Sequence, residues 1–216
     1  AEMYYVDPAG SDATGDGSSQ APWATIGHAV NQGIGPEGGH EVVARDGTYE
    51  GDITIGRGFA QPVVVRAEHP YRVTLTNVAG GIDVLRIYVE GSANLTFEGF
   101  VFTNEDPGYT CSGRESHYVI HIQDASDVTL RDNIIHGAGA AGRCNELLKI
   151  NRGSESIYPR GILVEGNLFY DPANAGGADM IDSVRPGEID IVENVFWGEP
   201  AHDQSQSFIT LKRQAP

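Results

Sequence analysis

Residues able to do chemistry concentrate in the second half of the chain, where basic and acidic side chains recur at related positions. Lys149 is a candidate general base, because a lysine among other cations gives up its proton more readily than usual. Arg152 and Arg185 are the cations that we expect beside it. Carboxylates offer the hard oxygen ligands that calcium prefers. Calcium is therefore the candidate cofactor, and its candidate ligands are Asp179, Asp182 and Glu146.

Four short apolar segments can be laid over one another: 119–123, 147–151, 180–184 and 208–212. Their third positions form one outward row, made of His121, Lys149, Asp182 and Thr210. His121 is thus a candidate substrate contact, against the alternative of a hydrogen-bonded surface histidine. Lys149 beside Asp182 is equally well explained as a surface ion pair, which contributes little. Arg185, followed by proline and glycine, has the alternative role of bracing a turn.

A repeat explains why these segments align. Similar stretches begin at Leu95, Val128, Ile162 and Ile189, and the last three have asparagine at their sixth position. Self-similarity at a period of about 20–50 residues is typical of solenoids. Each stretch alternates apolar and polar residues, as a strand with one buried face does. The pattern predicts an all-β parallel β-helix with two or three short strands in each coil.

The asparagines mark a corner of each coil. Asn133, Asn167 and Asn194 suit this place, because asparagine tolerates a left-handed backbone and its amide bonds backbone groups in turns. Stacked in successive coils, their side chains can also bond one another in a ladder. After the corner comes a buried row and then an outward column; the column is Thr103, His136, Tyr170 and Trp197. Tyr170 and Trp197 are candidate sugar-stacking residues, with packing under a loop as the alternative.

The repeat also sets the domain organisation. We expect one β-helix domain over residues 1–216, with an N-terminal strand, loop and capping helix in 1–40 and the coils in 41–216. Pro22 is expected to open the helix, with Trp23, Ile26 and Val30 on its apolar face. The last coil stops soon after residue 212. We therefore expect an incomplete C-terminal coil that a missing segment or another subunit covers.

Composition narrows the partners and the compartment. The net charge of −16 argues against nucleic acid, and no apolar run is long enough for a transmembrane helix. Cys111 and Cys144 are one repeat apart, so a disulfide between successive coils is geometrically reasonable and predicts an oxidising compartment. The alternative is a pair of buried thiols.

Three N-terminal motifs carry a resemblance to a known superfamily. They are Tyr5-Val-Asp-Pro-Ala-Gly-Ser-Asp, Ala21-Pro-Trp-Ala-Thr-Ile and Asp46-Gly-Thr-Tyr49. This combination resembles the N-terminal signature of secreted right-handed parallel β-helix proteins, which include pectate lyases, chondroitinase-B-like lyases and alginate lyases. The resemblance implies a right-handed helix and a secreted protein. It leaves the activity open, because the same fold supports many reactions.

The C-terminal coils resemble, in part, the lyases of the chondroitinase B and alginate type. Asp179 and Asp182 stand on the acidic strand, although spaced by three, and Arg185 stands where those lyases have lysine. Lys212 and Arg213 stand where the next coil has arginine, and both are candidate substrate contacts. The resemblance implies a lyase that cleaves a uronate polysaccharide by β-elimination. The alternatives are a non-catalytic glycan-binding or structural module and a polysaccharide hydrolase.

Overall fold

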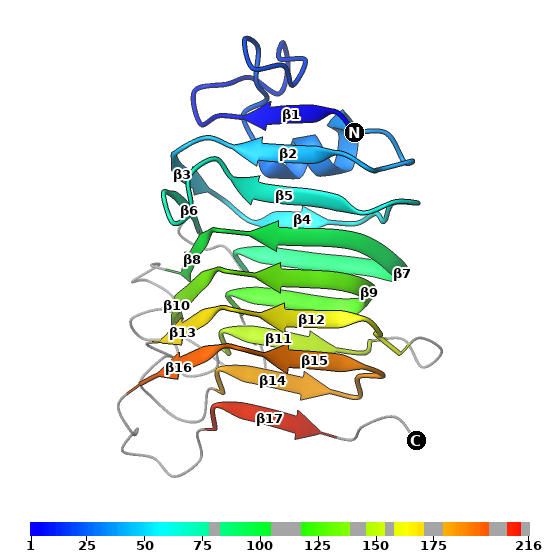
Figure 1. Cartoon of the computed structure of the whole chain (residues 1–216), viewed down its shortest axis with the longest axis vertical. Coiled ribbons are helices and arrows are strands. Elements are labelled where there is room, and N and C mark those ends of the chain that lie inside the picture. Colours follow the sequence, from blue (N-terminus) through cyan, green and yellow to red (C-terminus); the bar gives the residue numbers. More distant parts are fainter. Residues whose placement is uncertain are drawn as a thin grey trace.

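The computed structural model describes residues 1–77, 83–104, 118–138, 146–153, 158–170, 179–198 and 207–212. Its strands pair in parallel and stack along one axis, with β1 (Met3–Val6) and β17 (Ile209–Lys212) at opposite ends of the stack (Figure 1). The predicted parallel β-helix is therefore confirmed. Within these ranges, no helix has the length and apolar character needed to cross a membrane.

Two long strands connect the faces of the helix. The first parts of β7 (Leu85–Glu98) and β9 (Ile120–Arg131) pair with each other across one face, and their last parts pair across the next. The first face continues through β4 (Ile53–Ile55), β11 (Leu148–Asn151), β14 (Ile181–Val184) and β17 (Ile209–Lys212). The second face continues through β1 (Met3–Val6), β2 (Glu41–Ala44), β5 (Val63–Ala67), β12 (Ile162–Glu165) and β15 (Ile189–Val192).

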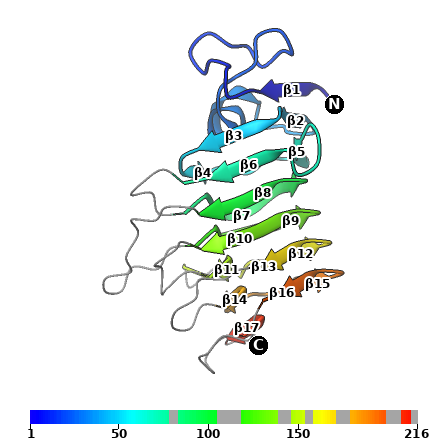
Figure 2. The same ribbon diagram turned by 90° about the vertical axis from the view of Figure 1, so that its left-hand side faces the viewer.

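The third face is a separate six-stranded sheet, visible along the side of the stack in Figure 2. Its strands are β3 (Gly47–Glu50), β6 (Val73–Thr76), β8 (Val101–Asn104), β10 (Ile134–Ala138), β13 (Leu168–Tyr170) and β16 (Val195–Trp197). Parallel pairing over all three faces brings residues about one repeat apart to neighbouring positions.

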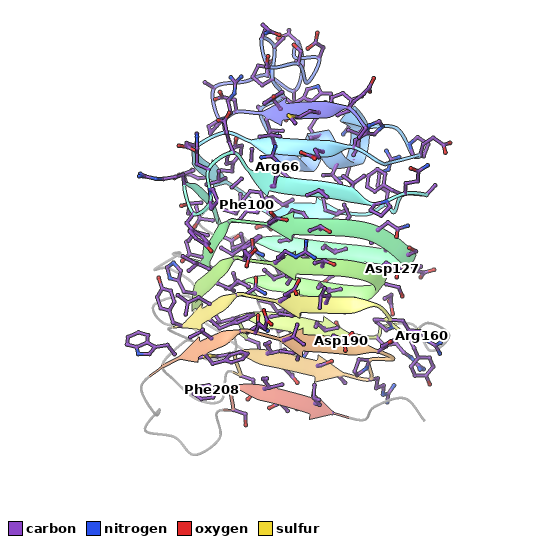
Figure 3. All side chains as sticks on the ribbon, in the orientation of Figure 1. Arg66, Phe100, Asp127, Arg160, Asp190 and Phe208 are labelled. Carbon is purple, nitrogen blue, oxygen red and sulfur yellow. The ribbon has the colours of Figure 1, made fainter. Side chains whose placement is uncertain are left out.

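Alternating apolar side chains fill the interior. On the first face the predicted inward row is confirmed for Ile120, Leu148 and Ile181, which are fully buried. The row ends at β17, where Ile209 and Leu211 are exposed. Phe208, just before this strand, is exposed as well (Figure 3). On the third face the predicted row is also confirmed by the strand register, and it comprises Phe102, Ile135, Phe169 and Phe196.

The asparagine ladder forms between the second and third faces. Asn133 Nδ2 donates to Asn167 Oδ1 at 3.1 Å, and Asn167 Nδ2 donates to Asn194 Oδ1 at 3.0 Å. Each asparagine side chain thus satisfies polar groups of the neighbouring coil, as predicted. The left-handed residue is not the asparagine itself. It is the residue before it in each coil, Asp132, Gly166 and Glu193.

The N-terminal cap differs from the prediction in where its helix begins. The α-helix α1 covers only Ile26–His28 and continues as a π-helix, η1, over Ala29–Gly33. Pro22 does not open it, because Trp23 pairs with Val6 of β1 and the helix cap is Thr25. The predicted apolar face is confirmed, since Trp23, Ile26 and Val30 are all buried over the first coil.

Candidate functional site

One outward row crosses the first face and carries most of the candidate residues. The predicted row is confirmed, because Lys149 lies beside His121 on one side and Asp182 on the other, and Asp182 lies beside Thr210. Arg86 extends the row by one coil, as the register partner of His121. Sequence reasoning missed Arg86, although the alternation Leu85-Arg-Ile-Tyr88 was the signal that could have identified it.

The C-terminal half of this row forms a compact group of charges, which we call the lysine–carboxylate centre: Glu146, Lys149, Asp179, Asp182 and Lys212. Lys149 Nζ donates to Asp182 Oδ2, and Lys212 Nζ donates to the same oxygen at 3.1 Å. Lys149 Nζ is also 3.9 Å from Glu146 Oε1, and Lys212 Nζ is 4.0 Å from Asp179 Oδ2. The strands β11, β14 and β17 thus bring acids and lysines of three coils into one network.

Burial gives the centre unusual electrostatics. The Asp182 side chain is 1% exposed and Lys149 is 12% exposed, whereas Lys212 is half exposed. Burial raises the pKa of Glu146 from 4.5 to about 7, and the Asp182 carboxylate adds to the rise while Lys149 opposes it. Glu146 Oε2 and Asp182 Oδ1 are both buried without a hydrogen-bond partner among the described residues. The centre therefore holds a carboxyl group that can change its protonation state near neutral pH.

A histidine cluster occupies the neighbouring coil. Tyr88 Oη lies 2.7 Å from His121 Nδ1, and His121 Nε2 lies 2.6 Å from Asn151 Oδ1. Asp83 Oδ2 is 3.6 Å from the same Nδ1, and the Tyr118 ring packs edge-on against the imidazole at 4.6 Å. His121 is buried and both ring nitrogens contact protein groups, which is the hydrogen-bonded alternative from the sequence. Its predicted contact with substrate remains a prediction.

The two arginines expected beside Lys149 lie elsewhere on the coils. Arg152 follows the end of β11, and its guanidinium lies 4.2 Å from the centroid of the Tyr158 ring. Arg185 follows β14 in a left-handed conformation, and its backbone N–H donates to the carbonyl of Lys212 at 2.8 Å. The contacts of the described residues join neither arginine to Lys149. This geometry favours the turn-bracing interpretation of Arg185.

The aromatic column lies on the third face, away from the lysine–carboxylate centre. Its predicted register is confirmed, with His136 beside Thr103 and Tyr170, and Tyr170 beside Trp197. The His136 and Tyr170 rings stack on each other at 4.5 Å and 8°, so each ring covers a face of the other. Trp197 is tilted from Tyr170 by 61° and is 64% exposed. Trp197 therefore presents the most open aromatic surface of this column.

Three of the predicted site residues lie outside the described residues. They are Cys111, Cys144 and Arg213. The disulfide and the role of Arg213 remain predictions.

The predicted calcium ligands do not fit a calcium ion. The described residues contain one group of three potential ligands with atoms within 4.8 Å of one another, and it is the exposed trio Asp46, Glu68 and His69. Glu146, Asp179 and Asp182 do not form such a group. Ammonium nitrogens already contact Asp182 Oδ2, and Asp179 Oδ1 accepts the Ser207 N–H at 2.9 Å. Calcium needs six to eight oxygen ligands around it.

Comparison with known proteins identifies the fold. No protein-family model matches the sequence, and no curated protein matches it either. Among solved structures, a rhamnogalacturonan lyase superposes with a TM-score of 0.61 and 16% identity over 99% of this chain and 62% of that chain. The chain is a right-handed parallel β-helix. It spans about three fifths of the length of that lyase.

Two further structures share this β-helix. A pectin methylesterase from Aspergillus niger superposes with a TM-score of 0.56 and 13% identity, over 98% of this chain and 74% of that chain. A mannuronic acid specific polysaccharide family 6 lyase from human gut microbiota has a TM-score of 0.55 and 20% identity, over 98% of this chain and 52% of that chain. The identities are low, so the likeness concerns the fold.

Proposed function

We propose that this β-helix is an extracellular carbohydrate-active protein, and that it cleaves a uronate-containing polysaccharide by β-elimination at the lysine–carboxylate centre. The observation that carries the proposal is that one centre holds both a half-exposed ammonium, Lys212 on Asp182, and a carboxyl group, Glu146 beside Lys149, whose pKa is about 7. The names of the structural neighbours support the substrate class, since they include lyases for rhamnogalacturonan and for mannuronic acid.

β-Elimination needs a positive charge and a base. The substrate carboxylate must be neutralised before the neighbouring carbon can lose its proton, and the exposed Lys212 ammonium can do so. The base takes that proton, a double bond forms between this carbon and the next, and the glycosidic C–O bond breaks. The leaving oxygen then takes up a proton. These steps conserve the substrate's atoms and electrons apart from the proton exchanged with the protein.

Glu146 is the group that we assign as base. A carboxyl group with a pKa of about 7 is deprotonated in half of the molecules at neutral pH and is a stronger base than an ordinary glutamate. Lys149, the base expected from the sequence, is largely buried, and its Nζ donates to Asp182 Oδ2. We therefore assign Lys149 to the orientation of Asp182 and Glu146.

A glycan-binding role without catalysis is the second candidate. The observation that favours it is Trp197, whose exposed indole on the third face could stack on a sugar ring. Binding through this face would not involve the lysine–carboxylate centre. The two functions therefore depend on different residues.

The test is an elimination assay with a matched pair of variants. The protein is incubated with pectate, alginate and glycosaminoglycans, with and without calcium, and the ultraviolet absorbance of the unsaturated product is followed. We expect Glu146→Gln to lower kcat by about 100-fold or more, as the loss of a general base does. Glu188→Gln, at an exposed glutamate outside the centre, should leave kcat unchanged.

Each result of this assay has a definite meaning. A folded protein that forms no product on any polymer would sink the lyase proposal. Retained binding that is lost in Trp197→Ala would then support the glycan-binding function. Product formation that Glu146→Gln leaves unchanged would remove Glu146 as the base.

A further inference from the structure

One carboxylate oxygen in the lysine–carboxylate centre is shared by two lysines. Asp182 Oδ2 accepts from Lys149 Nζ and from Lys212 Nζ, the latter at 3.1 Å. These residues come from three successive coils, because β14 lies between β11 and β17. Two cations that converge on one buried oxygen repel each other, so this arrangement needs further negative charge nearby. Glu146 and Asp179 supply it, each within 4.0 Å of one lysine.

We propose that Lys149 and Lys212 take the place of a divalent cation, so that the centre neither binds nor requires calcium. The inference rests on the proposed function only where it assigns the centre to a polysaccharide carboxylate. Its structural content concerns which cation neutralises Glu146, Asp179 and Asp182, and this can be tested without any substrate.

Charge and geometry both support the replacement of a divalent cation by the two lysines. The three carboxylates carry up to three negative charges, and the two ammoniums supply two positive charges within 4.0 Å of them. A calcium ion bound by Asp182 Oδ2 would lie well within hydrogen-bonding distance of that oxygen, where Lys149 and Lys212 already donate. Calcium on this oxygen would displace the buried Lys149 ammonium, which would lose its partner.

The same argument explains how the site stays open to substrate. Lys149 is largely buried and holds Asp182, whereas Lys212 is half exposed at the edge strand β17. A hydrogen-bonded lysine keeps its charge fixed on the chain, and among the described residues the ion pairs of Lys212 Nζ are with Asp182 and Asp179. The Lys212 ammonium can thus bind a substrate carboxylate as a second anion, beside Asp182. In a metal-dependent lyase a calcium ion would bind that carboxylate.

The prediction for the unmodified protein is the decisive one. Thermal unfolding and isothermal titration calorimetry are measured with and without millimolar calcium chloride, on the full chain and on Asp182→Asn. We expect that any calcium-dependent change seen in the unmodified protein is also seen in Asp182→Asn. A rise in Tm with calcium that disappears in Asp182→Asn would overturn the proposal. A rise that survives in Asp182→Asn places calcium outside the centre and supports it.

Removing both ammoniums should create the missing cation site. In Lys149→Met/Lys212→Met, three carboxylates remain without a counter-ion, and we expect calcium to raise the Tm by several degrees. Adding Asp182→Asn to this variant should abolish the rise. If the double variant folds and shows no calcium response, the lysines do not stand in for a cation and the proposal fails. If it folds only with calcium, as circular dichroism would show, the proposal is supported.

Two further variants keep the test independent of folding and of activity. Lys212→Met alone removes the exposed lysine, and we expect it to show a weaker calcium response than the double variant. Arg131→Met removes a cation between Glu98 and Glu165 on the second face, where we expect no calcium response because those carboxylates are about one third exposed to water. Absence of lyase activity would contradict the proposed function and would leave these calcium measurements unaffected.

Discussion

Two outward rows of this β-helix carry charges across successive coils, and they are built differently. On the second face, Arg66, Glu98, Arg131 and Glu165 follow one another in register, so positive and negative charges alternate. Arg66 marks the start of this row on β5 (Figure 3). On the first face, Arg86, His121 and Lys149 follow one another before the first acid, Asp182.

The two rows differ in how their charges are stabilised. In the second-face row, Arg131 contacts Glu165 at 2.9 Å and Glu98 at 3.8 Å, and all three side chains are at least one third exposed. Water and oppositely charged neighbours stabilise every charge of this row, so the row contributes to the stacking of the coils. In the first-face row, Arg86, His121 and Lys149 follow one another with no acid between them, and two of the carboxylates that contact them, Asp83 and Asp182, are buried. Architecture alone does not require such an arrangement, and this makes the first face the functional candidate.

The largest contrast should come from removing one acid from each row. Asp182→Asn leaves Lys149 and Lys212 without their shared counter-ion, and loss of a buried partner costs about 3 kcal/mol or more. Glu165→Gln on the exposed row should cost at most about 1 kcal/mol. Urea denaturation at pH 7 measures both free energies of unfolding. Equal losses in the two variants would show that the rows do not differ as described.

A pH titration of stability should give the next largest effect. The pKa of folded Glu146 is about 7, above its ordinary 4.5, so the folded protein holds this proton more tightly than the unfolded chain does. The resulting stabilisation is complete below pH 4.5 and is lost as the pH rises through 7. Relative to Glu146→Gln, the unmodified protein should therefore lose about 3 kcal/mol between pH 4 and pH 8.

The control for this titration is again on the second face. Glu165→Gln removes a carboxylate that pairs with Arg131 and is about one third exposed. The measurement is urea denaturation at several pH values for all three proteins. If the free energies of unfolding of the unmodified protein and Glu146→Gln changed with pH in the same way, the pKa of Glu146 would not be raised. Glu146 could then not be assigned as the base.

The sequence predicts the first-face row because, in parallel coils, equivalent positions of successive repeats lie side by side. Once the alternation in 147–151 and 180–184 is aligned, Lys149 must lie beside Asp182, and the structure agrees. Inward and outward positions follow from the same period of two. The asparagine ladder is predictable for the same reason, since Asn133 and Asn167 occupy one corner in successive coils.

Side-chain direction was harder to predict than register. Arg152 was expected beside Lys149, but the Tyr158 ring holds its guanidinium beyond the end of the strand. Glu146 is predicted from the sequence as a calcium ligand, whereas the rise of its pKa to about 7 follows from its burial, which the sequence does not specify. Contacts such as these depend on how long side chains bend between coils, which the alternation of a strand does not specify. The start of α1 was missed because Asp12, a residue far along the N-terminal loop, binds the cap residue Thr25.

The smallest expected effect concerns salt, and it separates the two rows by mechanism. Arg131→Met should cost at most about 1 kcal/mol in low salt, because its ion pairs are exposed. That cost should vanish in about 1 M sodium chloride, where the screening length falls to about 3 Å. The loss caused by Asp182→Asn should persist there, because ions in solution do not reach a buried oxygen. Urea denaturation at both salt concentrations compares the variants. If salt also erased the Asp182→Asn deficit, the first-face lysines would be solvated ion pairs like those of the second face, and neither row would be distinguished as a site.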